Sequence, residues 1–143
     1  MVQPDCAIFG RKDYQQLQVI RYMTREMSFP VEIISAPTLR ESSGLAMSSR
    51  NQYLTDSERL IAPKIYENLC AMRKAYQQGV PLEQIEQQAV QNLEQAGFEV
   101  DYVEILSSNL GKASRSSSKQ RVALIAARLG LTRLIDNLEF DIN

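Results

Sequence analysis

The stretch Cys6-Ala7-Ile8-Phe9-Gly10-Arg11-Lys12-Asp13 decides the fold class of this chain, because it joins a strand to a helix. Its first four residues are predicted to form a short buried strand that ends at Gly10. Asp13 begins a helix that we expect to extend to about Ser28, since apolar residues recur there at helical spacing. These residues are Leu17, Ile20, Met23 and Met27. The run Val31-Glu32-Ile33-Ile34-Ser35 is predicted to be a second strand, which completes a βαβ unit.

The chain after residue 38 is predicted to form a smaller α+β domain. Thr55-Asp56-Ser57-Glu58 is a capping box, in which the threonine and glutamate side chains each bond a backbone amide. The helix that it begins should extend to about Gln78 and be kinked or divided at Pro63. A further helix is predicted between Pro81 and Gly97, with an apolar stripe on one face. That stripe consists of Leu82, Ile85, Ala89 and Leu93.

Three strands are predicted in the carboxyl-terminal part of the chain, at Tyr102–Leu106, Arg121–Arg128 and Thr132–Ile135. The middle strand is mostly apolar and is therefore predicted to be buried on both faces. The segment Ser107–Ser118 is polar and serine-rich, and we expect it to be a mobile surface connection.

Composition and charge exclude several classes of function. Lys and Arg total 16 and Asp and Glu total 17, a net charge of −1 that favours neither nucleic acid nor an anionic membrane. The longest apolar run, Val122–Ala127, is too short to span a bilayer. Cys6 and Cys70 form no metal or redox motif, and we expect two reduced, buried thiols in a cytoplasmic protein. The chain has no histidine, which excludes histidine bases and histidine metal sites, and we expect no metal bound by protein side chains.

Two short polar clusters carry residues that suit a phosphate group. Gly10-Arg11-Lys12-Asp13 lies between a strand and a helix, where open α/β sheets bind anionic ligands. Gln16 follows Lys12 by one helical turn and should face the same crevice. Ser48-Ser49-Arg50 supplies two hydroxyls and a permanent positive charge within a predicted loop, Thr38–Gln52. The two clusters predict a nucleotide site, provided that they converge on one ligand.

Each cluster also has an interpretation that needs no ligand. The first would be a solvated basic turn in which Asp13 caps the helix, and spacing alone favours this interpretation. In the second, the serines would stabilise turns and Arg50 would pair with a carboxylate on the surface.

Four ordered blocks of the sequence resemble the pantothenate synthetase (pantoate–β-alanine ligase) family, and they cover essentially the whole chain. The blocks are Gly10-x-Lys12-Asp13-Tyr14-Gln15-Gln16-Leu17, Val31-Glu32-Ile33, Gly44-Leu45-Ala46-Met47-Ser48-Ser49-Arg50-Asn51-x-Tyr53-Leu54 and Ala126-Ala127-Arg128-Leu129-Gly130-x-Thr132-Arg133-Leu134-Ile135-Asp136-Asn137. Four blocks at family-like spacing are far more specific than either polar cluster alone.

The resemblance implies a nucleotidyltransferase-type Rossmann enzyme, related to class I aminoacyl-tRNA synthetases, that joins pantoate to β-alanine with ATP and Mg²⁺. Pantoate would first be adenylated with release of pyrophosphate, and the amine of β-alanine would then displace AMP to give pantothenate. The implied fold class is α/β. Residues 1–38 would be the terminal βαβ part of a Rossmann-like ATP-binding domain, 39–54 a phosphate-binding loop and hinge, and 55–143 a small α+β carboxyl-terminal lid domain. The full-length enzyme would be a homodimer.

The resemblance also implies roles for individual residues. The first cluster, Gly10, Arg11, Lys12 and Asp13, would contact ATP, and Gln16 would hold pantoate. Leu39 lies where the family places a backbone contact to adenine. Met47, Ser48, Ser49 and Arg50 correspond to the flexible Lys-Met-Ser-Lys-Ser-type loop that closes over the triphosphate. The catalytic groups would be Lys12, Ser48, Ser49 and Arg50.

The chain departs from the family pattern at its amino-terminal side. The family's His-x-Gly-His segment is absent, and so are the first strands of the sheet. Arg11 stands where the family usually has Glu, which adds positive charge beside Lys12. The region Ser114–Lys119 matches no family feature and is interpreted as a linker. We therefore expect the chain to be the carboxyl-terminal half of such an enzyme, beginning just before the last βαβ step.

Three other functions are compatible with the sequence. The chain could be a non-catalytic module that binds nucleotide through Lys12 and Arg50, which calorimetry with an ATP analogue would reveal. It could be an interaction protein whose open sheet edge pairs with another copy, which light scattering would reveal. It could also be a different adenylate-forming enzyme of the same superfamily, although Gln15-Gln16 and Asp136-Asn137 favour the pantothenate synthetase family.

A steady-state assay with ATP, pantoate and β-alanine is expected to show no AMP formation by the 143-residue chain alone. The physical reason is that phosphate charge would be only partly neutralised and the pantoate pocket would be incomplete. Robust turnover by the isolated chain would refute this expectation.

Overall fold

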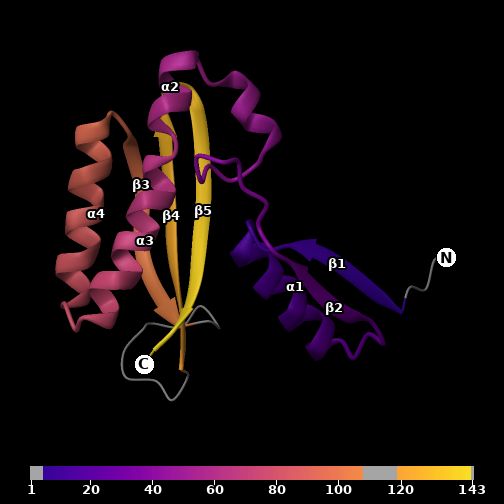
Figure 1. Ribbon diagram of the computed structural model, residues 1–143. Coiled ribbons are helices and arrows are strands. Elements are labelled where there is room, and N and C mark those ends of the chain that lie inside the picture. The colour runs from indigo at the N-terminus through magenta and orange to yellow at the C-terminus, as the bar shows by residue number, and fades with distance from the viewer. Residues whose placement is uncertain (1–4, 108–118, 143) are drawn as a thin grey trace. The chain divides into compact units, whose positions relative to one another are not determined.

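The computed structural model describes residues 5–107 and 119–142, and the chain divides into two compact units (Figure 1). The first unit comprises Met1–Leu39 and the second unit Arg40–Asn143. Each unit contains helices and strands, so the chain is a mixed α/β protein, as predicted. Within the described ranges, no helix is long and apolar enough to cross a membrane.

The first unit is a βαβ unit with a parallel strand pair. Its strands are β1 (Cys6–Gly10) and β2 (Glu32–Ala36), and α1 (Tyr14–Glu26) connects them. The register pairs Cys6 with Glu32 and Gly10 with Ala36, so both strands end at the same edge. This arrangement confirms the predicted strand–helix–strand order and places the first polar cluster at the carboxyl end of β1.

The first unit buries less apolar surface than its sequence predicts. The Ile8 side chain is 68% exposed, so the expectation of a buried first strand is wrong. Along the apolar stripe of α1, Leu17 is buried, whereas Met23 and Met27 are exposed. The reason is geometric, because a single helix on a two-stranded sheet covers only part of either element.

The second unit contains a three-stranded antiparallel sheet with β4 in the centre. Its strands are β3 (Glu99–Ser107), β4 (Gln120–Leu129) and β5 (Thr132–Asp141). Two long helices, α3 (Lys64–Gln77) and α4 (Leu82–Ala96), lie side by side against one face of this sheet (Figure 1).

The helix boundaries in the second unit follow local signals in the sequence. The Thr55 hydroxyl accepts a hydrogen bond from the Glu58 amide at 3.2 Å, and this cap begins α2 (Asp56–Ile61). Pro63 separates α2 from α3, which confirms the predicted division. α4 ends at Gly97, whose φ of +106° lies in the left-handed region that favours glycine.

Only one half of the predicted capping box forms. The Glu58 carboxylate does not reach back to the backbone amide of Thr55 in the part of the chain that the structure describes. It lies instead against the turn between β4 and β5, where a Cβ on Gly130 would be 2.8 Å from Oε1. A side chain at position 130 would therefore collide with this carboxylate.

The core of the second unit is built on β4, as the apolar run in its sequence predicts. All residues from 121 to 127 are buried, with α3 and α4 packed on one face and β3 and β5 on either side. The predicted stripe of α4 contributes Ile85, Ala89 and Leu93 to this core, while Leu82 is partly buried beside it. Arg121 enters the same layer and donates from Nε to the Tyr76 hydroxyl at 3.1 Å.

Several predictions for the second unit are wrong in detail. β5 continues to Asp141 rather than ending at Ile135. Ser107 is the buried last residue of β3 and not part of a surface connection, and residues 108–118 of that segment lie outside the described ranges. The cysteines are free thiols, but Cys6 is exposed and Cys70 only partly buried, so the prediction of two buried thiols is incorrect.

Leu69→Ala should lower the free energy of unfolding by about 3 kcal/mol, because the cavity left by a buried leucine is costly. The Leu69 side chain on α3 has 0% exposure, whereas Leu60 on α2 is 82% exposed. The matched control Leu60→Ala should change stability by less than about 0.5 kcal/mol. Urea unfolding measures both variants, and equal losses would contradict this packing of α3.

Candidate functional site

The first polar cluster is fixed to the strand pair through Arg11. The Arg11 amide donates to the Ala36 carbonyl at 2.8 Å, and its guanidinium Nη2 donates to the Ser35 hydroxyl at 3.2 Å. Both bonds join the turn after β1 to the end of β2. Arg11 therefore has a structural contact in this unit, and its predicted contact with ATP stays a prediction.

The other members of the first cluster lie at the amino end of α1. Asp13 occupies the cap position of this helix, but its exposed side chain makes no capping hydrogen bond. The ligand-free interpretation is confirmed in placing Asp13 at the N-cap, although no side-chain bond accompanies this position. Gln16 is exposed on the first turn of α1, and Lys12 is half-buried beside it. Lys12 follows the carboxyl end of β1, an edge at which α/β sheets bind anions, and Gln16 lies on the helix that begins there.

The second polar cluster opens a short 3₁₀ helix, η1 (Ser49–Tyr53), instead of lying in an irregular loop. The hydroxyl of Ser48 accepts a hydrogen bond from the Arg50 amide at 3.2 Å and so caps this helix. Met47, Ser49 and Arg50 are exposed, and Ser48 is half-buried. Among the residues that the structure describes, Arg50 makes no ion pair, so the alternative of a surface salt bridge is not supported.

A tight hairpin-like turn precedes the second cluster and fixes its starting point. Arg40 and Ala46 form an isolated antiparallel bridge, and the Glu41 amide donates to the Leu45 carbonyl at 2.8 Å. The turn closes with a bond from the Gly44 amide to the Glu41 carbonyl at 2.9 Å. Leu45 and Ala46 are buried, so the chain enters the exposed segment from a packed position.

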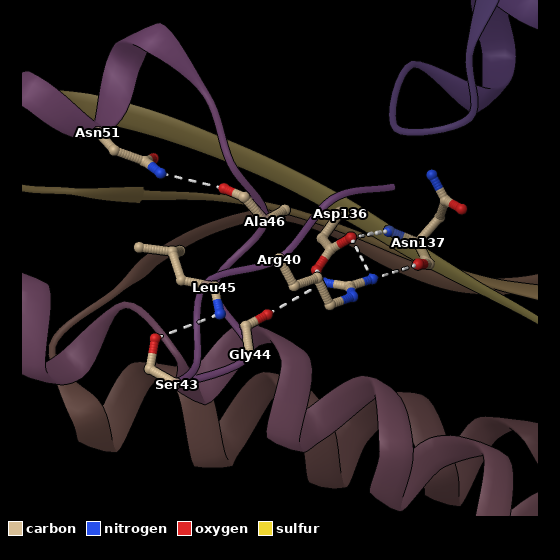
Figure 2. Close-up of polar contacts among 8 residues, drawn as sticks. All are labelled: Arg40, Ser43, Gly44, Leu45, Ala46, Asn51, Asp136 and Asn137. Atoms are coloured by element: carbon tan, nitrogen blue, oxygen red, sulfur yellow. Dashed lines mark hydrogen bonds and ion pairs between the residues drawn. The ribbon is translucent and has the colours of Figure 1, made fainter. Parts of the chain in front are cut away.

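A buried ion pair attaches this turn to β5 (Figure 2). The Arg40 guanidinium donates to both carboxylate oxygens of Asp136, at 2.5 and 3.0 Å. It also donates to the carbonyls of Asn137, at 3.2 Å, and Gly44, at 3.1 Å. The Asp136 side chain is only 3% exposed, and Arg40 is its charged partner, while the Asn137 amide also donates to Oδ1 at 2.8 Å.

An aromatic ring and a glycine complete the surroundings of Arg40. The guanidinium carbon lies 4.0 Å from the centroid of the Tyr66 ring, a cation–π contact. The side-chain hydrogen bond with Cys70 raises the pKa of Tyr66, while Arg40 and Arg73 act in the opposite direction. Gly44 has a φ of +94°, and a Cβ there would lie 2.6 Å from Cδ1 of Tyr66, so only glycine fits.

Sequence reasoning did not identify Arg40 or Asn51 as parts of this arrangement. Asn51 is buried in η1 and donates from Nδ2 to the Ala46 carbonyl at 3.0 Å (Figure 2). One signal was available, because the polar pair Asp136-Asn137 directly follows the apolar pair Leu134-Ile135. A carboxylate in such a position needs a cation, but the sequence does not say which of the chain's arginines supplies it.

The predicted site residues are distributed over both units. Gly10–Asp13, Gln16 and the exposed Leu39 belong to the first unit, and Met47–Arg50 belong to the second unit. Convergence of the two clusters on one ligand stays a prediction. No group of three or more Cys, Asp or Glu side chains in the described ranges could hold a metal ion.

Comparisons with known proteins agree with the sequence resemblance. A model of the pantoate-beta-alanine ligase family matches residues 1–139. Pantothenate synthetase of Xanthomonas euvesicatoria pv. vesicatoria is 55% identical over 139 residues, which are 97% of this chain and 50% of the relative. The chain thus spans about half the length of the curated relatives that it matches.

Solved structures of the same family are also similar to this chain. Pantothenate synthetase from Thermus thermophilus has a TM-score of 0.87 and 42% identity, over 96% of this chain and 50% of its own. The pantoate-beta-alanine ligase from Francisella tularensis was solved in complex with beta-gamma ATP and β-alanine. It has a TM-score of 0.66 and 29% identity, over 95% of this chain and 44% of its own.

Asp136→Asn should lower the free energy of unfolding by about 3 kcal/mol, because it leaves the Arg40 charge without its buried partner. The matched control is Asp101→Asn, which breaks a more exposed pair with Arg133 on the same sheet. That control should cost less than about 1 kcal/mol. Chemical denaturation compares the two, and a negligible effect of Asp136→Asn would show that the pair does not hold the turn.

Proposed function

We propose that this chain, which belongs to the pantoate-beta-alanine ligase family, supplies part of the site that condenses pantoate with β-alanine using ATP. In the first step, a carboxylate oxygen of pantoate attacks the α-phosphorus, and the bond to pyrophosphate breaks. In the second step, the amine of β-alanine attacks the acyl carbon of pantoyl adenylate. AMP leaves with the electron pair of the broken bond, the amine loses a proton, and pantothenate forms.

The residues that carry this proposal are those of the two polar clusters. Lys12, Ser48, Ser49 and Arg50 would stabilise the phosphates during adenylation, and Gly10, Arg11, Asp13, Leu39 and Met47 would complete the ATP contacts. Gln16 would bind pantoate. The observation that supports these roles best is the exposure of Ser49 and Arg50 above a buried base, which leaves the hydroxyl and guanidinium available to a ligand.

The chemistry suits a chain without histidine. Adenylation needs no protein nucleophile, because the carboxylate of the substrate attacks. The main obstacles are charge crowding at phosphorus and alignment of the two reactants. Lysine, arginine and hydroxyl donors around the phosphates address both obstacles, and each such donor contributes about 3 kcal/mol to transition-state stabilisation.

The proposal extends to the architecture and the partners of the chain. Residues 1–38 would be the terminal βαβ part of a Rossmann-like domain, 39–54 a hinge with the phosphate-binding loop, and 55–143 a lid. The division into compact units between Leu39 and Arg40 supports a hinge at this point. Mg²⁺ would arrive as the complex of ATP, and the full-length enzyme would be a cytoplasmic homodimer.

A reconstitution experiment tests the proposed function. The chain is mixed with the half of the Xanthomonas relative that it does not match, and AMP formation is followed after addition of ATP, pantoate and β-alanine. We expect activity in the mixture, and a loss of about a hundredfold with Arg50→Ala, as for removal of one transition-state donor.

The control variant is Arg128→Ala, which removes another exposed arginine of the second unit. This variant should leave the rate unchanged, because Arg128 lies outside both polar clusters. Equal rates for Arg50→Ala and the parent mixture would exclude the role given to Arg50. Nucleotide binding without turnover in any mixture would favour the non-catalytic alternative.

A further inference from the structure

Asn51 is a buried amide directly beside an exposed functional segment. Its side chain is 3% exposed, whereas its neighbours Arg50 and Gln52 are both exposed. Residues of this kind seldom enter an interior without a specific hydrogen bond, because an unbonded buried amide is costly. The contacts of Asn51 therefore indicate what the residue does.

Three hydrogen bonds of Asn51 bracket the segment Met47–Arg50. Its Nδ2 donates to the Ala46 carbonyl at 3.0 Å, immediately before the segment begins. Its backbone amide donates to the Ser48 carbonyl at 3.1 Å, within the segment. Its own carbonyl accepts from the Leu54 amide at 3.2 Å, after the segment ends. Because Asn51 directly follows Arg50, the bond from its Nδ2 to Ala46 joins the two ends of the exposed segment.

The position to which Asn51 binds is itself fixed. Ala46 is paired with Arg40 across the antiparallel bridge, and Arg40 is bound to Asp136 on β5. A continuous set of contacts therefore leads from the central sheet to Asn51. Because the base is fixed, the bond from Nδ2 to Ala46 determines how the segment leaves the surface.

The other side-chain atom of Asn51 makes no hydrogen bond among the described residues, where Oδ1 is buried. The bond from Nδ2 to Ala46 is therefore the side-chain hydrogen bond by which Asn51 constrains the segment.

We propose that Asn51 is a positioning residue, which holds Met47–Arg50 in the shape that presents the serine hydroxyls and the Arg50 guanidinium to the phosphates of a nucleotide. This inference rests on the proposed function for the identity of the ligand. The conclusion that Asn51 constrains the segment Met47–Arg50 rests on the hydrogen bonds alone.

Asn51→Leu tests the inference, because leucine has nearly the same volume but makes no hydrogen bond. The matched control is Asn68→Leu, which removes another buried amide, one that donates to the Lys64 carbonyl at 2.8 Å in α3. The first measurement is amide hydrogen exchange of residues 46–54 in the whole chain. Asn51→Leu should accelerate it by about fivefold, the effect of losing one hydrogen bond, and Asn68→Leu should not.

The second measurement separates positioning from a general structural effect. Calorimetry gives the dissociation constants of a non-hydrolysable ATP analogue and of AMP, under conditions where every variant is folded. Asn51→Leu should weaken binding of the ATP analogue by about tenfold, consistent with misplacing one charged donor, and leave AMP binding unchanged. A merely structural role would weaken both ligands equally, and that result would overturn the inference.

The outcomes distinguish this inference from the proposed function. Unchanged exchange in Asn51→Leu overturns the inference, whatever the nucleotide results are. Accelerated exchange together with a selective loss of ATP-analogue binding supports both. Accelerated exchange in Asn51→Leu, together with a reconstituted parent mixture that binds neither nucleotide, supports the hydrogen-bond contacts of Asn51 with the segment. The same result overturns the proposed function and, with it, the inference that Asn51 positions the segment for a nucleotide.

Discussion

The buried carboxylate of Asp136 requires a cation, and this requirement organises the candidate site of the second unit. Arg40 satisfies it from a segment that is distant in sequence, and in doing so brings the 40–46 turn onto β5. The guanidinium then lies over Tyr66, and the close approach of this ring leaves room only for a glycine at position 44. These contacts fix the point at which the exposed segment Met47–Arg50 begins.

Local signals predicted the elements whose boundaries depend on neighbouring residues. The apolar stripe and Gly97 predicted α4, Pro63 predicted the division between α2 and α3, and the apolar run predicted β4. The end of β5 was not predictable in this way, because the buried Asp136 carboxylate pairs with Arg40, which is distant in sequence. The neighbours of Asp136 in the sequence do not indicate which distant arginine pairs with it.

The candidate site shows the same division between local and long-range information. The residue types that suit phosphate were evident in the sequence, and the resemblance to the family suggested their roles. The sequence did not show that Arg11 bonds to Ser35 at the end of β2, or that Asn51 holds the carbonyl of Ala46. Both contacts depend on backbone positions that only the folded chain defines.

The sparse packing of the first unit has a consequence for handling the chain in solution. Ile8 on β1, Val19 on α1 and Met27 just after α1 are exposed apolar residues, and in the described ranges the outer edges of the β1–β2 pair bond to no other strand. Exposed apolar surfaces associate at high protein concentration, and unpaired strand edges form hydrogen bonds with the edges of other molecules. Yield and solubility during expression would therefore depend on dilution, on chaperones or on a companion polypeptide that shields this surface.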